Sequence, residues 1–178
     1  MKHTILLILL FILVSFFSCN NIKKMSLLGK RITFPTEVPF IVYTSGTNFT
    51  EGYFSSENLS NGTRFKILCS TDSSGCTGCK MQLDRWKSLM EELLPYTVKF
   101  LFFVQPKNID DFKYIVLNEN FQAPLCLDVE NVFCNLNPFM VNQVVLLDSD
   151  NRIVVIGNPI EDKEVKKEMI DAIRKNEM

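Results

Sequence analysis

The stretch Arg64–Trp86, RFKILCSTDSSGCTGCKMQLDRW, decides the fold because it leads from an apolar run through two closely spaced cysteines into a helical pattern. Residues 64–70 form a short apolar run that predicts a buried strand. From Lys80 to Leu94 the apolar residues recur at spacings of three and four, as on one face of a helix, and Pro95 ends the pattern. We therefore expect a strand, a polar loop, a Cys-x-x-Cys pair and a helix in direct succession.

This context gives the two cysteines different chemical roles. Cys76 falls at the start of the predicted helix, where unpaired backbone N–H groups and the helix dipole stabilise a thiolate. We expect Cys79, one turn further on, to lie deeper and to be shielded from solvent. Gly75 and Gly78 keep side chains away from the sulfurs, so that another protein can approach. The pair is suited to a redox couple in which Cys76 attacks and Cys79 resolves.

Two other interpretations of the pair stay open: a permanent structural disulfide and part of a metal site. The sequence has 6 cysteines and 1 histidine, and that histidine, His3, lies in a predicted signal peptide. Five cysteines remain for the fold after Cys19, and an odd count leaves at least one thiol without a permanent partner. Without an imidazole, a zinc site would need four thiolates, and Cys-His or Ser-His-Asp catalysis is excluded.

The other three cysteines are expected to be packed residues rather than reactive ones. Cys69 and Cys126 lie in apolar, strand-like segments and are expected to be core residues. Cys134 lies in a short turn, where a packed free cysteine is the favoured interpretation. Pairing with Cys126 or a relay of electrons is the alternative for Cys134.

The rest of the chain alternates strand and helix patterns. An N-terminal part has strand-like residues at 32–34 and 40–43, and residues 44–62 read as turns around at most one short strand. Further strands are expected at residues 97–104 and 124–127 and as a hairpin at 143–148 and 152–157, with helices at 108–120, 130–136 and 161–175. This order predicts an α/β fold with one mixed sheet flanked by helices.

The Arg64–Trp86 stretch, the hairpin QVVLLDSDNRIVVIGNP and the terminal helix together resemble the thioredoxin-like fold, and specifically the TlpA-type thiol-disulfide oxidoreductases anchored in the bacterial envelope. The resemblance covers roughly residues 64–175. It implies a three-layer sandwich with an N-terminal β extension, a nucleophilic Cys76 and a resolving Cys79. It also implies protein thiol or disulfide substrates and an upstream redox partner, with no cofactor.

Three positions differ from the pattern of that family. Gly75 stands where the family has Trp, Ser70 stands where a buried acid is frequent, and Asn142 stands near the position of a cis-proline that contributes to substrate docking. Without that buried acid, proton transfer to Cys79 would need Asp72 or water. The differences favour one alternative function, a non-catalytic binding module whose disulfide is structural. A third class, handling of metal or of a haem apoprotein, also stays open.

The N-terminus predicts export and membrane attachment. Residues 1–18 have the positive start, the apolar middle and the small residue before the cleavage site that are typical of a signal peptide. Cys19 then matches the lipid-modified cysteine of bacterial lipoproteins, and residues 19–30 form a tether to a domain at 31–178, whose β extension covers 31–63. We expect a periplasm-facing protein, lipid-anchored in the envelope of a Gram-negative bacterium, where disulfides persist. A formal charge of −1 without a basic cluster argues against nucleic acid as a partner.

Overall fold

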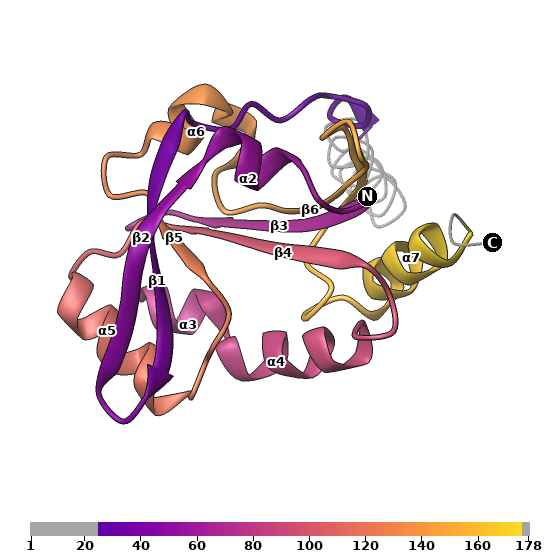
Figure 1. The fold of residues 1–178 in the computed structure, drawn as a ribbon. Coiled ribbons are helices and arrows are strands. Elements are labelled where there is room, and N and C mark those ends of the chain that lie inside the picture. Colours follow the sequence, from indigo (N-terminus) through magenta and orange to yellow (C-terminus); the bar gives the residue numbers. More distant parts are fainter. Residues whose placement is uncertain (1–24, 176–178) are drawn as a thin grey trace, which may run out of the picture.

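A computed structural model describes residues 25–175, and the predicted signal peptide and Cys19 lie outside these residues. The described chain forms a seven-stranded mixed sheet in the order β2-β1-β5-β4-β3-β6-β7 (Figure 1). Its three central strands are mutually parallel, and β1, β2, β6 and β7 join antiparallel to their neighbours. The strands are β1 Glu37–Ser45, β2 Asn48–Ser55, β3 Phe65–Thr71, β4 Val98–Val104, β5 Leu125–Leu127, β6 Val144–Leu147 and β7 Ile153–Ile156.

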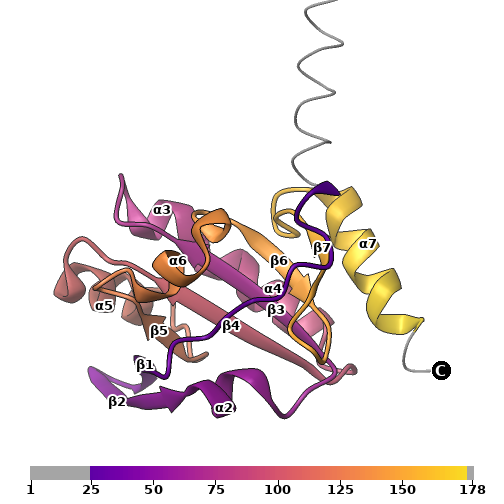
Figure 2. The same ribbon diagram turned by 90° about the horizontal axis from the view of Figure 1, so that it is seen from above.

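Helices cover both faces of the sheet, as Figures 1 and 2 show from two directions. On one face lie α3, α4, α5 and α7, and on the other lie the short α2 and α6. Their bounds are α2 Ser56–Ser60, α3 Thr77–Met81, α4 Leu83–Glu92, α5 Ile109–Asn118, α6 Val132–Leu136 and α7 Lys163–Arg174, with a 3-10 turn at Pro138–Met140. All seven residues of β3 are buried, as expected for a parallel strand covered on both sides.

Aromatic side chains build the core beneath α4. The Trp86 ring meets the Phe102 ring edge-on at 5.2 Å between centroids, and the Phe121 ring meets the Phe102 ring edge-on at 5.5 Å. All three side chains are almost completely buried, and each contributes roughly 1.5–3 kcal/mol by leaving water. This core fixes α4, and through it the α3 region, against the central strands.

The N-terminal segment before β1 covers the hydrophobic core on the other face of the sheet. Phe103 and Phe133 stack at 4.0 Å, and Phe34 stacks beside both. The buried Asn137 side chain accepts a hydrogen bond from the Thr33 N–H at 2.9 Å and donates to the Thr33 carbonyl at 2.8 Å. The segment before β1 is therefore part of the fold and holds α6 in place.

The two edges of the sheet differ. Along the outer edge of β7, the Gly29 N–H donates to the Ile153 carbonyl, and the Ile153 N–H donates to the Lys30 carbonyl. The Ile32 N–H then donates to the Asn151 carbonyl, so the N-terminal segment runs beside β7 (Figure 2). No described residue pairs with the outer edge of β2.

The predicted α/β fold is confirmed, with three local differences. Residues 44–62, expected to be mostly turns, contain all of β2 and α2, where Ser55 and Asn58 form a reciprocal helix cap. Residues 32–34 form no strand. The predicted helix from Lys80 to Leu94 is interrupted at Gln82, whose φ of 43° breaks it into α3 and α4.

Within residues 25–175, none of the helices has both the length and the apolar composition needed to cross a bilayer.

Candidate functional site

The two cysteines of the motif lie at the surface, just after β3. Cys76 and Cys79 form a disulfide with their Cα atoms 5.3 Å apart. Cys76 caps the N-terminus of α3, and its Sγ accepts a hydrogen bond from the Cys79 N–H at 3.1 Å. A backbone donor at this sulfur would stabilise a thiolate on Cys76 after reduction.

The expectation that Cys79 is shielded from solvent is wrong, because Cys79 is exposed, as Cys76 is. The reason is the orientation of α3, which turns Thr77 and Met81 inward. Residues four apart share one face of a helix, so Cys79, between them, faces outward. Both residues of the disulfide are therefore accessible from the surface.

The two glycines of the motif have different structural roles. Gly75 has a φ of +72°, which favours glycine, and a Cβ there would meet no atom within 4 Å. A Cβ on Gly78 would lie 2.7 Å from Cδ1 of Ile115 on α5. Gly78 thus permits close packing of α3 on α5, which the sequence alone did not reveal, and only Gly75 leaves open space.

An ion pair brackets the disulfide. Lys80 Nζ contacts the Asp72 carboxylate and donates to Ser74 Oγ at 2.9 Å, while Ser74 Oγ donates to Asp72 at 2.8 Å. The hydrogen bond from Lys80 is the main cause that lowers the pKa of Asp72 to about 2. Asp72 is therefore ionised at neutral pH, and it is too weak a base to serve as the proton carrier considered from the sequence.

The segment before β6 lies against the loop that precedes the disulfide. Asn142, with a φ of 53°, accepts a hydrogen bond from the Asp72 N–H through its side-chain oxygen at 3.0 Å. The carbonyl of its neighbour Gln143 accepts from the Ser70 N–H at 2.9 Å. All peptide bonds of the described residues are trans. Near the position that the resemblance assigns to a cis-proline, the chain thus has an asparagine whose side chain bonds to the loop before the disulfide.

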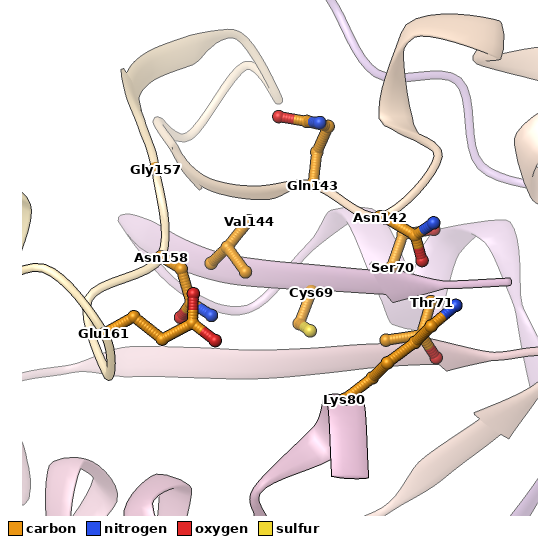
Figure 3. Close-up of a pocket in the computed structure, with 10 residues that line it drawn as sticks. All are labelled: Cys69, Ser70, Thr71, Lys80, Asn142, Gln143, Val144, Gly157, Asn158 and Glu161. Atoms are coloured by element: carbon orange, nitrogen blue, oxygen red, sulfur yellow. The ribbon is translucent and has the colours of Figure 1, made fainter. Parts of the chain in front are cut away.

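Two hollows flank this region. A cavity of about 350 Å³ has Lys80 at one end, Asn158 and Glu161 at the other, and Cys69 between them (Figure 3). A groove of about 520 Å³ lies on the other side, between Cys76 and the α5 residues Asp111 and Ile115. Of these two hollows, only the groove is lined by a residue of the disulfide.

The remaining three thiols are buried and free, as expected for packed cysteines. Burial, and secondarily the charge of Glu161, raises the pKa of Cys69 to about 12, and burial likewise raises the pKa of Cys126 to about 12. Cys134 lies 3.3 Å from Ser70 Oγ, and burial raises its pKa as well. Cys134 does not pair with Cys126. In the described part of the chain, no group of three or more His, Cys, Asp or Glu residues is arranged to hold a metal ion.

No family model matches the sequence, and no curated protein matches it. Similar solved structures include the thioredoxin domain of a thiol-disulfide oxidoreductase from Bacteroides vulgatus, with a TM-score of 0.54 and 13% identity over 80% of this chain and 97% of that one. AhpC of Mycobacterium tuberculosis gives a TM-score of 0.58 at 12% identity, over 83% of this chain and 97% of its own. The chain has a thioredoxin-like fold.

Peroxiredoxins share this fold as well. The reduced 2-Cys peroxiredoxin of Plasmodium vivax gives a TM-score of 0.57 at 14% identity, over 85% of this chain and 98% of its own. Identities this low establish the arrangement of the sheet and its helices and leave the chemistry to the residues of this chain.

Proposed function

We propose that the protein is a thiol-disulfide oxidoreductase that acts on protein disulfides in the bacterial envelope through Cys76 and Cys79. The observation that carries the proposal is an exposed disulfide after β3, one of the three parallel strands of a thioredoxin-like fold, with the first cysteine at a helix cap. The occurrence of thiol-disulfide oxidoreductases among the similar structures supports it.

The reducing direction illustrates the chemistry. The Cys76 thiolate attacks one sulfur of a substrate disulfide, forms a mixed disulfide and releases the other substrate sulfur as a thiolate. The Cys79 thiolate then attacks Cys76 Sγ and releases the second substrate thiolate. Two electrons pass to the substrate, and Cys76 and Cys79 end as the disulfide. A dithiol partner upstream must restore the reduced pair.

A trapping experiment tests this function. Cys79→Ser keeps the attacking sulfur and removes the resolving one, so it should accumulate mixed disulfides with protein substrates. The double variant Cys76→Ser/Cys79→Ser is the matched control and should trap none. The wild type should reduce insulin with dithiothreitol as electron donor, and Cys76→Ser should not. A wild type without this activity, whose Cys79→Ser variant traps nothing, would contradict the proposal.

A non-catalytic binding module with a structural disulfide is the second candidate, and the observation that favours it is Asn142 in place of the family's proline. A structural disulfide should resist mild reductant, and its loss should unfold the chain. A redox-active pair should open reversibly in dithiothreitol with the fold intact, as followed by circular dichroism.

We also propose that Cys19 carries the lipid that anchors the protein to the envelope membrane, facing the periplasm. The proposal is supported by the signal-peptide pattern and the small residue before Cys19. In a Gram-negative host, the wild type should fractionate with membranes and its N-terminal peptide should carry the mass of a diacylglycerol. The Cys19→Ala variant should leave the membrane fraction. An unmodified Cys19 in the exported protein would contradict this part.

A further inference from the structure

The charged residues closest in sequence to the dithiol form one connected unit. Asp72 comes four residues before Cys76, and Lys80 directly follows Cys79. We call Asp72, Ser74 and Lys80 the clasp, because the contact between Lys80 and Asp72 closes a loop that contains the whole motif. Ser74 joins the two, since its Oγ accepts from Lys80 at 2.9 Å and donates to Asp72 at 2.8 Å.

Within the clasp, several hydrogen bonds hold Asp72 in place, whereas the side chain of Lys80 can move. The Asp72 N–H is held by Asn142, and the Asp72 carboxylate accepts from both the N–H and the hydroxyl of Ser74. Lys80 has a flexible side chain that is 29% exposed and reaches the cavity of Figure 3. An ammonium group on such a stem can shift between acceptors without moving the backbone.

Lys80 is also close to Cys76 along the backbone. Its N–H donates to the Cys76 carbonyl at 3.1 Å, the bond that joins residues four apart in a helix. The ammonium group of Lys80 bonds to the hydroxyl of Ser74, which comes two residues before Cys76. Its positive charge therefore lies in the same loop that presents Cys76 at the start of α3.

We propose that Lys80 is the positioning residue that stabilises the Cys76 thiolate, and that Asp72 limits this effect by neutralising Lys80. The inference rests on the proposed redox function of the pair. When dithiothreitol reduces the disulfide, two electrons pass to the pair, and dithiothreitol becomes its cyclic disulfide. One protein sulfur takes a proton, the other remains a thiolate, and the second proton enters the solvent. Lys80 then shares its charge between Asp72 and that thiolate.

Three other charged residues line the two hollows beside the disulfide. Across the groove lie Lys107 and Asp111, which have opposite signs. Across the cavity, Glu161 faces Lys80. The effects of Lys107 and Asp111 on Cys76 should partly cancel because their charges are opposite, and the Glu161 carboxylate accepts a hydrogen bond from the Gln82 side chain.

The proposal predicts opposite effects for the two charged partners. Lys80→Gln removes the cation and leaves Asp72 near the sulfur, so it should raise the pKa of the Cys76 thiol by about half a unit. Asp72→Asn frees Lys80 and should lower that pKa by about the same amount. If the clasp only held the loop in shape, both variants would loosen the same loop and shift the pKa in the same direction.

The measurement is the pH dependence of the alkylation rate at Cys76, followed by peptide mass spectrometry on the reduced full chain with iodoacetamide. Lys80→Arg should retain the wild-type profile. Lys166→Gln breaks the Lys166–Glu92 pair between α7 and α4 and is the matched control, with no expected shift. Salt at about 1 M should shrink the difference between Lys80→Gln and wild type, because exposed charges are screened.

Equal profiles for wild type and Lys80→Gln, or shifts of the same sign in Lys80→Gln and Asp72→Asn, would overturn the inference. Its outcome is separable from that of the proposed function. Opposite pKa shifts in a protein that traps no substrate would leave the inference standing and reject the oxidoreductase. If the protein traps substrates but neither substitution changes the pKa of the Cys76 thiol, the inference fails and the proposed oxidoreductase function stands.

Discussion

The described chain holds two sets of cysteines whose surroundings differ in nearly every physical respect. Cys76 and Cys79 are exposed, joined to each other and bracketed by an ion pair. Cys69, Cys126 and Cys134 are buried and free. Cys69 is only seven residues before Cys76, yet burial keeps its thiol protonated. Reactivity therefore follows from where the strand ends and the loop begins, because that point separates a desolvated sulfur from an accessible one.

The largest expected effect is a difference in alkylation rate between the two sets. In the reduced native protein at pH 8, iodoacetamide should modify Cys76 and Cys79 at least about 1,000-fold faster than Cys69 and Cys126. The reason is that a thiol whose pKa is about 12 is almost never a thiolate at that pH. Peptide mass spectrometry at timed intervals measures the rates, and denatured protein is the control, in which all five should react alike. Comparable rates in the native state would contradict the expected difference between the exposed and the buried cysteines.

The second prediction compares stability instead of reactivity. Cys126→Ala removes a sulfur from a site that is 1% exposed and should lower the free energy of unfolding by about 1–2 kcal/mol through the cavity it leaves. Cys79→Ser, measured in reduced protein, should change it by less than about 0.5 kcal/mol, because the site is exposed. Urea unfolding under reducing conditions gives both values. A larger loss for Cys79→Ser than for Cys126→Ala would show that the exposed pair also has a packing role.

The third prediction concerns the two glycines beside the exposed pair. Gly78→Ala should cost about 1 kcal/mol, since crowding against Ile115 outweighs the gain in helix propensity. Gly75→Ala should cost about 1–2 kcal/mol through its left-handed backbone. Ile115→Val removes Cδ1 and should rescue part of the Gly78→Ala loss while leaving the Gly75→Ala loss unchanged. Urea midpoints of the single and double variants test this, and equal rescue of both would disprove the distinction.

The smallest expected effect is on acid stability near the exposed pair. The folded-state pKa of Asp72 is lowered to about 2, so its contribution is present above its ordinary pKa and is lost as the pH falls from about 4 to about 2. Because the ion pair is partly exposed, we expect less than about 1 kcal/mol. Asp72→Asn should flatten the stability profile in this interval, measured by urea unfolding at each pH. An unchanged slope would mean that the clasp adds nothing to folding.

Much of the fold could be predicted because its strongest patterns are local. The apolar runs of β3 and β4 and the stripe of α7 predict those elements directly, and they were confirmed. The sequence allowed at most one short strand at residues 44–62 but did not locate β2, because β2 pairs only with β1 and has no buried residue. The break at Gln82 was missed because glutamine is a good helix former and the sequence has no glycine or proline at that point.

The sequence predicted the cysteine pair of the candidate site but not the surroundings of that pair. The Cys-x-x-Cys pattern identifies the pair in sequence, and the burial of Cys69 follows from its strand. The exposure of Cys79 depends on how five residues of α3 are rotated against the sheet. The contact of Lys80 with Asp72 depends on the path of the loop between them. Neither leaves a periodic signal in the sequence.

The pairing of residues 29–32 with β7 has a consequence for any shortened form of the protein. Those residues complete one side of the sheet, while β2 leaves the other side open. Removing the chain up to Phe34 would expose a second row of unpaired backbone groups and uncover the apolar surface around Phe133. A sheet with two open edges and an exposed apolar face is a template for strand addition. A truncated protein of this kind should self-associate more strongly than the full chain.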